Sequence, residues 1–300
     1  MKKILITTLI VVFFAAATPV SATFTDNGDG TVTDDVTGLM WIQNDDKQVQ
    51  NKDAACEYCA DLSKEEFAGY GDWRAPTIEE LQTTIDYRDN LPAGDDILFN
   101  GTTNRYYLSS TEQHNVSDYY WTIDSSIGAV INWSSEFSSW FGWPSSAYIR
   151  CVRGNMVKTT FVDNGDEETV TSSDGLVWSK QTSDEMMNWE AAKAYCEDLE
   201  AGGMSDWFLP TVEELRTLIA YDQAGPAADT LLFEIETENY GYYLTATDLD
   251  GDTETKAWQI AFLSGYTEPL NKTIAGWVRC AHEAPPENVC DCPPPPCLRA

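Results

Sequence analysis

The sequence predicts an α+β fold that is built twice along the chain. Three observations support this prediction: a long internal repeat, a hairpin signal at the start of each copy, and two helix patterns in each copy. The repeat is clearest at its start, where FTDNGDGTVTDDVTGLMW (residues 24–41) corresponds to FVDNGDEETVTSSDGLVW (residues 161–178). Self-similarity on this scale indicates a tandem duplication of one folded unit.

The two copies stay matched almost to their ends. Trp41 and Trp178 are 137 residues apart, as are Trp121 and Trp258. Elsewhere the separation changes by a few residues, which we expect in loops, where insertions are tolerated. The other matched segments are DWRAPTIEELQTTIDY (72–87) with DWFLPTVEELRTLIAY (206–221), YYLSST (106–111) with YYLTAT (242–247), and IRCVR (149–153) with VRCAH (278–282).

The composition divides the chain into four parts. The Pro- and Cys-rich end of the sequence, EAPPENVCDCPPPPCLRA, has no apolar pattern and predicts an extended spacer or attachment segment. The predicted parts are a signal peptide (1–22), a first domain (23–155), a second domain (156–283) and this tail (284–300).

Each copy is expected to begin with a β-hairpin followed by a helix. Asp-Asn-Gly-Asp, at 26–29 and 163–166, is turn chemistry between short runs rich in Thr and Val. Apolar residues at helical spacing then predict the first helix of each copy. These residues are Ala55, Cys59 and Leu62 in the first copy, and Trp189, Ala192, Cys196 and Leu199 in the second.

A second helix in each copy begins with a capping box. Thr77 with Glu80, and Thr211 with Glu214, have the spacing at which hydroxyl and carboxylate each bond an unpaired backbone N–H. A proline precedes each cap, where its missing N–H costs nothing. The apolar faces expected on these helices are Ile78, Leu81 and Ile85, and Val212, Leu215 and Ile219. Short antiparallel strands and long loops are expected in the rest of each copy.

Charge excludes two classes of partner. The 300 residues carry 49 acidic against 18 basic side chains, a formal net charge of -31, which repels nucleic acid and anionic membrane surfaces. Only two histidines, His114 and His282, are present, which leaves little for zinc or triad chemistry. Hydrophobic residues make up 43% of the chain, enough for a packed core.

The first 22 residues have the pattern of a signal peptide. Lys2 and Lys3 precede an apolar run from Ile4 to Ala17, and Val-Ser-Ala ends at Ala22 as a cleavage site. We therefore expect an exported protein that is secreted, periplasmic or displayed on the cell surface, with no membrane insertion after cleavage. An uncleaved anchor is the alternative.

Together, these motifs resemble the Lcl C-terminal domain family, named after the end domain of a collagen-like bacterial adhesin. The resemblance rests on the DNGDGTVTD opening, the A-x-x-YC helix, the DWR-x-PT-x-x-EL segment and the closing R-C, and it covers nearly the whole mature chain. The last three elements also resemble the formylglycine-generating-enzyme branch of the C-type-lectin-like fold. The resemblance thus implies two tandem C-type-lectin-like domains.

The two copies depart from the family pattern at different positions. Ala75 stands for the usual Leu in the first copy, and Phe208 stands for Arg in the second. In the second copy, Glu167 and Glu168 replace the Gly-Thr of the opening turn. A shared ligand for both copies is therefore not implied.

The cysteines predict two disulfides, because export brings the chain into an oxidising compartment. Cys59 with Cys151, and Cys196 with Cys280, occupy equivalent places and would join the first helix to the last strand of each copy. Closing loops of this length stabilises a domain by about 4 kcal/mol in the chain-entropy model. The pairing of the remaining cysteines stays open, and it includes self-association between molecules; these are Cys56, Cys290, Cys292 and Cys297.

Calcium is the one candidate cofactor. Asp248, Asp250 and Asp252 offer oxygens at alternate positions, as calcium loops do, but the rest of an EF-hand loop is missing. The other candidate calcium ligands are Asp26, Asp29 and Asp34 in the first opening hairpin. The alternative is that these acids only form the turns, since turn chemistry alone explains Asp-Asn-Gly.

An aromatic segment in the first copy, INWSSEFSSWFGWP (131–144), is the candidate ligand-binding surface. Its aromatic residues alternate with small polar ones, a composition typical of recognition surfaces, and the second copy lacks them. The alternative is that they are core. The candidate residues are Trp133, Phe137, Trp140, Phe141 and Trp143. Six tryptophans that recur at matched places are predicted to be core: Trp41, Trp73, Trp121, Trp178, Trp207 and Trp258.

The sequence thus predicts a non-catalytic adhesin or lectin-like protein that recognises a glycan or a surface protein. A net charge of -31 argues against sulfated polysaccharide and favours a neutral sugar or a protein partner. A structural subunit of an extracellular fibre is the main alternative, through the tail cysteines. A polysaccharide hydrolase is the third reading, although no carboxylate pair is singled out.

Overall fold

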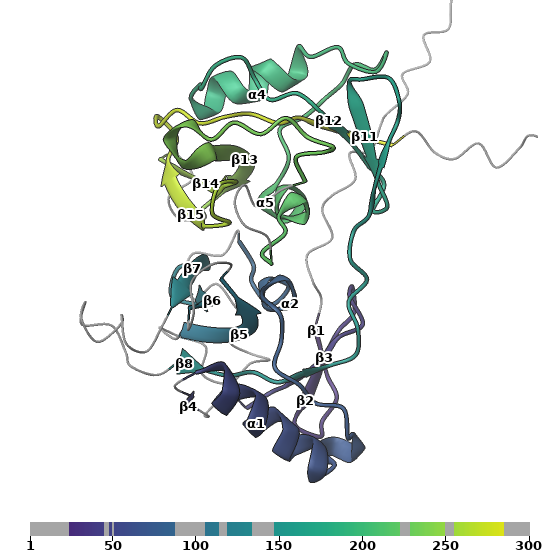
Figure 1. The fold of residues 1–300 in the computed structure, drawn as a ribbon, viewed down its shortest axis with the longest axis vertical. Coiled ribbons are helices and arrows are strands. Elements are labelled where there is room, and N and C mark those ends of the chain that lie inside the picture. Colours follow the sequence, from purple (N-terminus) through teal and green to yellow (C-terminus); the bar gives the residue numbers. More distant parts are fainter. Residues whose placement is uncertain are drawn as a thin grey trace, which may run out of the picture.

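The computed structural model describes residues 24–44, 48–49, 51–87, 106–113, 119–133, 147–222, 229–249 and 255–284. It is an α+β structure in which the two repeats lie end to end (Figure 1). The long helices α1 and α4 lie at opposite ends of the molecule, and the short helices α2 and α5 face each other near its middle. Among the described residues, no helix has both the length and the apolar character needed to span a membrane.

The described elements of the first repeat are β1 (Phe24–Asp26), β2 (Thr31–Asp34), β3 (Met40–Ile42), β4 (Gln48–Val49), α1 (Lys52–Lys64), η1 (Phe67–Gly69), α2 (Ile78–Gln82), β5 (Tyr106–Glu112), β6 (Tyr120–Asp124), β7 (Ala129–Trp133), β8 (Ala147–Tyr148) and β9 (Val152–Arg153).

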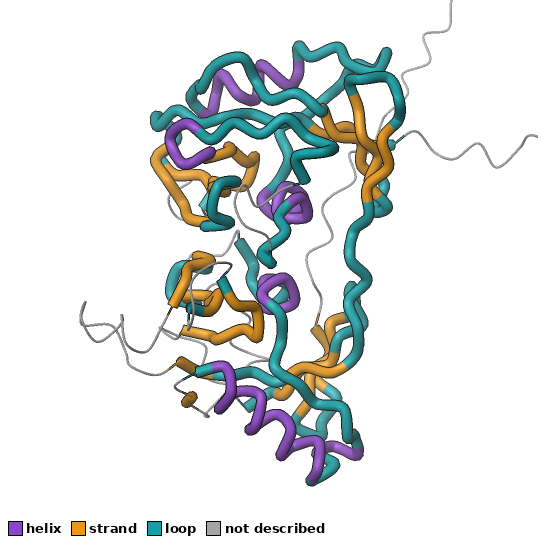
Figure 2. Tube along the Cα trace, viewed as in Figure 1, coloured by secondary structure: helices purple, strands orange, loops and turns teal. Residues whose placement is uncertain are grey.

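The described elements of the second repeat are β10 (Phe161–Asp163), β11 (Thr169–Ser172), β12 (Leu176–Ser179), α4 (Trp189–Glu197), α5 (Val212–Leu215), η2 (Arg216–Leu218), η3 (Glu238–Gly241), β13 (Tyr242–Asp248), β14 (Lys256–Ala261), β15 (Thr267–Asn271) and β16 (Ala281–Glu283). Residues 154–160, which we call the connecting loop, join β9 to β10 and run along one side of the molecule (Figure 2).

Strand pairing repeats between the copies. Each copy has a four-stranded sheet, in the order β1-β2-β3-β9 in the first and β10-β11-β12-β16 in the second. The other strands form one sheet of eight, in the order β13-β14-β15-β7-β6-β5-β8-β4. This sheet crosses the boundary between the repeats where β15 pairs with β7 in antiparallel orientation.

The opening hairpins are confirmed, but the ungapped alignment of their turns is wrong by one residue. Phe24 pairs with Asp34 in the first hairpin, and Phe161 pairs with Ser172 in the second, so Thr169 occupies the place of Thr31. The second hairpin therefore has one extra residue in its first turn and one fewer in its next. Hydrogen bonds from turn amides to Asp side chains hold both turns, which absorb such changes without moving the strands.

The predicted first helices are confirmed, and each begins at an asparagine that the sequence analysis did not single out. Asn51 accepts a hydrogen bond from the Ala54 amide, and Asn188 accepts one from the Ala191 amide. Predicted core residues on both helices are fully buried, among them Ala55 and Ala192.

Both capping boxes are present, yet the second helices are shorter than predicted. α2 ends at Gln82 and α5 at Leu215, so Ile85 and Ile219 lie beyond the regular helix rather than on its face. The first apolar residues of each face, Ile78 and Val212, are fully buried. Helices this short are not stable on their own, so the packing of their buried residues against the rest of the protein stabilises them.

Two disulfides staple the repeats internally, as predicted. Cys59 on α1 is bonded to Cys151 just before β9, and Cys196 on α4 is bonded to Cys280 just before β16. Neither bond crosses from one repeat to the other. The six recurring tryptophans are all buried, which confirms them as core.

The repeats also share one core. Tyr87 and Tyr221, at the ends of matched segments, are buried against Trp258 and Trp121 respectively, and each of these contacts joins one repeat to the other. Apolar residues of both repeats, including Val32, Ile78, Val170 and Val212, belong to a single hydrophobic cluster. The relative position of the two repeats is thus fixed by packing and by the continuous sheet.

Candidate functional site

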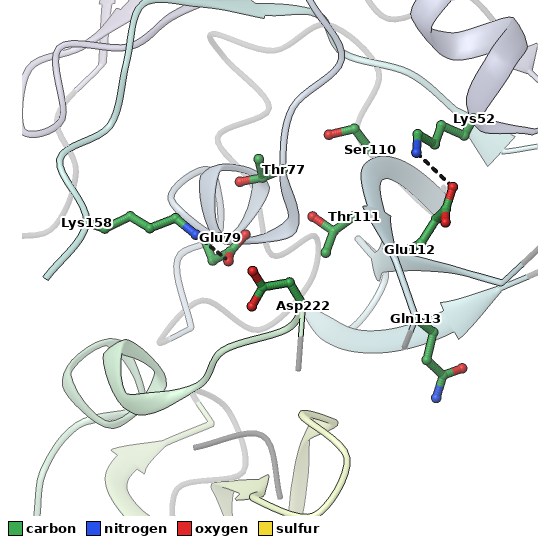
Figure 3. Close-up of a pocket in the computed structure, with 9 residues that line it drawn as sticks. All are labelled: Lys52, Thr77, Glu79, Ser110, Thr111, Glu112, Gln113, Lys158 and Asp222. Carbon is green, nitrogen blue, oxygen red and sulfur yellow. Dashed lines mark hydrogen bonds and ion pairs between the residues drawn. The ribbon is translucent and has the colours of Figure 1, made fainter. Parts of the chain in front are cut away.

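A polar cavity of about 500 Å³ lies where the first repeat meets the connecting loop and the second repeat. Figure 3 shows its lining side chains. They come from five segments that are distant in sequence. The lining residues are Lys52, Thr77, Glu79, Ser110, Thr111, Glu112, Gln113, Lys158 and Asp222.

Local structure fixes the inner wall of this cavity. Thr111, near the end of β5, accepts a hydrogen bond from the Ile78 amide at 3.1 Å, which ties the strand to the first turn of α2. Ser110 donates to the Pro76 carbonyl at 3.0 Å. The hydroxyls and carboxylates of this wall are therefore held on regular elements, as preorganised binding sites require.

Two ion pairs border the cavity. Lys52 Nζ lies 2.7 Å from Glu112 Oε1, and Lys158 Nζ lies 3.4 Å from Glu79 Oε1. The hydrogen bond to Glu112 raises the pKa of Lys52 above its ordinary value. Each lysine thus lies beside a carboxylate, and the opposite charges of each pair offset one another.

A second cavity of about 320 Å³ shares Glu79, Lys158 and Asp222 with the first. Its wall is more apolar, because the connecting loop contributes Met156 and Val157. We call the two adjoining cavities the junction groove. The second repeat enters it through Asp222, which Figure 3 shows pointing toward the same space as Glu79, and through residues after α5.

The second repeat does not reproduce the polar end of the groove. Trp189 occupies the place of Lys52, and Asp248 occupies the place of Glu112. Lys272 supplies the missing cation: its Nζ lies 2.6 Å from Asp248 Oδ1 and 4.0 Å from the centre of the Trp189 ring. The groove therefore belongs to one side of the molecule, the side along which the connecting loop runs.

The predicted ligand-binding aromatics are mostly outside the described residues. Trp133 ends β7, and the other four, Phe137, Trp140, Phe141 and Trp143, lie in the segment that the structure does not describe. That prediction stays a prediction.

The same holds for calcium. Asp248 is ion-paired with Lys272, while Asp250 and Asp252 lie outside the described residues. Within the described part of the chain, no three acidic, His or Cys side chains gather as a metal site. Asp26, Asp29 and Asp34 accept hydrogen bonds from neighbouring turn residues, as turn chemistry predicts.

Sequence reasoning missed the groove because its residues have other local explanations. Glu79 is an ordinary first-turn acid of a helix, and Asp222 directly follows a matched segment. Lys158 carries the one usable signal: it lies between the matched segments of the two copies, within the predicted second domain but before its first matched residue, so the repeat does not account for it.

Cys56 is exposed on α1 and forms no disulfide with any described cysteine. Cys290, Cys292 and Cys297 lie outside the described residues, so the pairing of these four stays open.

These features define a class of protein: a tandem α+β molecule, stapled by a disulfide within each repeat, with a groove at the junction of the repeats. Residues 30–153 and 168–282 each match the model of the Lcl C-terminal domain. The chain therefore belongs to the Lcl C-terminal domain family. A comparison with curated proteins gives no match.

Proposed function

We propose that the protein is an exported, non-catalytic binding protein of the adhesin or lectin type, and that it binds a neutral glycan. The observation that carries this proposal is the junction groove. A volume of about 500 Å³ lies within the range of small-ligand sites and has room for one or two sugar rings. Hydroxyl, amide and carboxylate groups, such as Thr77, Gln113 and Asp222, are the partners that sugar hydroxyls need.

Charge supports a neutral ligand over an anionic one. The lysines of the groove are already beside Glu112 and Glu79. The whole chain carries a net charge of -31, which repels sulfated or uronic polysaccharides at long range. The two internal disulfides support export, since such bonds persist in oxidising compartments. A C-type-lectin-like relationship of the two repeats, which rests on the sequence motifs, is part of this proposal.

The test is binding of the mature protein, residues 23–300, to a glycan array, followed by calorimetry with the best ligand. Lys158→Ala and Asp222→Asn should each weaken binding by about tenfold or more, because each removes a polar group from the groove. Lys64→Ala is the matched control, since Lys64 is an exposed lysine paired with Asp61 at the other end of α1 from Lys52, and it does not line the groove.

Two outcomes would contradict parts of the proposal, and a third, with calcium, would extend it. Binding that survives both groove variants but is lost in a Trp133/Trp140/Trp143→Ala variant would place recognition in the aromatic segment. Binding lost with a chelator and restored by calcium would establish the cofactor that the acidic loop predicts. Absence of saturable binding to neutral glycans, by protein shown to be folded, would overturn the glycan proposal and leave a surface-protein ligand.

The second candidate function is a structural subunit of an extracellular fibre. Exposure of Cys56 favours it, because a surface thiol with no disulfide partner among the described cysteines is a candidate for a bond between molecules. Non-reducing electrophoresis separates the two functions. A ladder that disappears in a variant with Cys56, Cys290, Cys292 and Cys297 replaced by Ser supports assembly, and a single monomer band contradicts it.

A further inference from the structure

The contact between the repeats is reciprocal. Trp121 of the first repeat donates its indole N–H to the Tyr221 carbonyl of the second at 3.2 Å. Trp258 of the second repeat donates to the Tyr87 carbonyl of the first at 2.7 Å. In each case the indole also packs edge-on against the same tyrosine, with ring centres 5.2 Å and 4.8 Å apart.

The residues that exchange these contacts are equivalents in the duplication. Trp258 corresponds to Trp121, and Tyr221 corresponds to Tyr87. Each repeat therefore gives its tryptophan to the tyrosine of the other. Such an exchange, in which residue i meets residue j and j meets i, is what a two-fold symmetric interface produces.

Strand pairing locates the symmetry axis. β7 and β15 are the third strands of equivalent meanders, and they meet in antiparallel orientation. The residues opposite each other are Val130 and Thr267, which are 137 residues apart and therefore equivalent. A two-fold axis between two equivalent strands requires this arrangement. The equivalent helices α2 and α5 also face each other across the middle of the molecule (Figure 1).

One equivalent pair breaks the symmetry. Gln82 at the end of α2 corresponds to Arg216 after α5. Gln82 donates to the Tyr221 hydroxyl at 3.0 Å, and Arg216 Nη1 donates to the Gln82 carbonyl at 2.6 Å. Two second repeats joined by the same symmetry would bring two Arg216 guanidinium groups together beside the axis, and like charges in a partly buried contact repel.

We propose that this face is a self-complementary dimer interface whose partner is another copy of the repeat, here supplied by the same chain. Arg216 makes the interface selective: it favours pairing of a first repeat with a second and disfavours pairing of two second repeats. The connecting loop keeps the partner at hand but does not hold the contact together.

The test uses the full chain with a protease site inserted between Val157 and Lys158, in the exposed connecting loop. Each disulfide lies within one repeat, so cleavage leaves the halves joined by non-covalent contacts alone. We expect the cleaved halves to elute together at micromolar concentration, with the mass of the uncleaved protein. Halves that separate on cleavage while each retains its near-ultraviolet circular dichroism would overturn the proposal.

Selectivity is tested by mixing labelled and unlabelled cleaved protein and recording native mass spectra after exchange. We expect pairs of first with second repeats and no detectable pair of second repeats. Arg216→Gln should allow pairs of second repeats to appear. Random pairing in the unaltered protein, or no new pair in Arg216→Gln, would overturn the role of Arg216.

A conservative double variant tests the reciprocal contacts themselves. Trp121→Phe with Trp258→Phe keeps two aromatic rings in place but removes both indole donors, and should weaken association of the cleaved halves by about tenfold or more. Trp207→Phe is the matched control, because Trp207 is equally buried but donates to Met204 within its own repeat. Equal weakening in both variants would contradict the proposal.

Discussion

The two repeats have similar backbone folds but differ in the surroundings of the capping-box glutamate, which is Glu80 in the first repeat and Glu214 in the second. In the first repeat, Arg74 forms two hydrogen bonds with Glu80, of 2.7 Å and 2.5 Å. In the second, Phe208 stands in the place of Arg74, and burial raises the pKa of Glu214 above its ordinary value. Both acids nevertheless complete their capping boxes.

This comparison shows what the fold requires of that position. Arg74 and Phe208 make the same backbone bridges, to Val152 and Ala281 respectively. The strand contact and the cap are therefore structural requirements, while the charge beside the acid is free to change. The backbone at this position therefore pairs with the last strand segment in both repeats, whereas the side chain binds the capping-box glutamate only in the first.

The largest expected effect is common to both repeats. Replacing Cys196 and Cys280 by Ser should lower the free energy of unfolding by about 4–5 kcal/mol, and the same change at Cys59 and Cys151 should cost about as much, because the closed loops of 84 and 92 residues are similar. Urea unfolding measures both. Cys56→Ser, which breaks no disulfide among the described residues, should change little.

A buried arginine should be the next most costly position to change. Arg279 is fully buried and donates to the carbonyls of Ser179, Lys180 and Glu234. Arg279→Met would remove the guanidinium donor from all three carbonyls, of which Lys180 and Glu234 keep a second donor in the Glu234 amide and the Thr182 hydroxyl. It should destabilise the protein by about 3 kcal/mol. Thermal and urea unfolding would show it. An unchanged midpoint would mean that water replaces the guanidinium.

Exchanging the residues that differ would sharpen the comparison. Arg74→Phe should lower stability by about 2 kcal/mol, because it leaves Glu80, which is almost fully buried, without its cation. Phe208→Arg, which offers Glu214 a partner, should cost less or be neutral. Urea unfolding at pH 7 measures both variants. Equal losses would show that packing, and not the ion pair, decides the position.

The smallest expected effect is a pH dependence of stability that arises from Glu214. An unfolded Glu titrates near pH 4.5, and burial raises the pKa of Glu214 above that value in the folded protein. The folded state therefore binds more protons between these two pKa values, so Glu214 reduces stability as pH rises through that window. Glu214→Gln keeps an acceptor for the cap and should remove this loss. Unfolding from pH 4 to 7 measures the difference between variant and parent.

Much of the fold was predictable because the chain contains two copies of the same unit, so residues that recur at matched positions could be recognised as structural. Matched tryptophans, the two cysteine pairs and the capping boxes were recognised by their recurrence, and all are present. The lengths of α2 and α5 were not predictable, since Ile85 and Ile219 keep helical spacing after the helix has ended. Tyr87 and Tyr221 also recur at matched positions. The sequence of one copy alone does not show that each tyrosine packs on the tryptophan of the other repeat.

The groove could not be predicted for a related reason. Its residues are distant in sequence, and only the meeting of two repeats and the connecting loop brings Glu79, Lys158 and Asp222 together. In the sequence, Arg279 could be recognised only as part of the closing R-C motif. Its burial could not be predicted, because backbone carbonyls accept its hydrogen bonds and these leave no pattern in a sequence.

The placement of the disulfides has a mechanical consequence. Tension applied between Phe24 and Glu283 passes through each Cys–Cys bond and bypasses the chain between its ends, 92 residues in one repeat and 84 in the other. At about 3.5 Å for each extended residue, these bypassed segments withhold roughly 320 Å and 290 Å of length. With both bonds intact, only the residues outside the two closed loops can extend under load, whereas in a reducing medium the same pull would stretch the chain about three times farther.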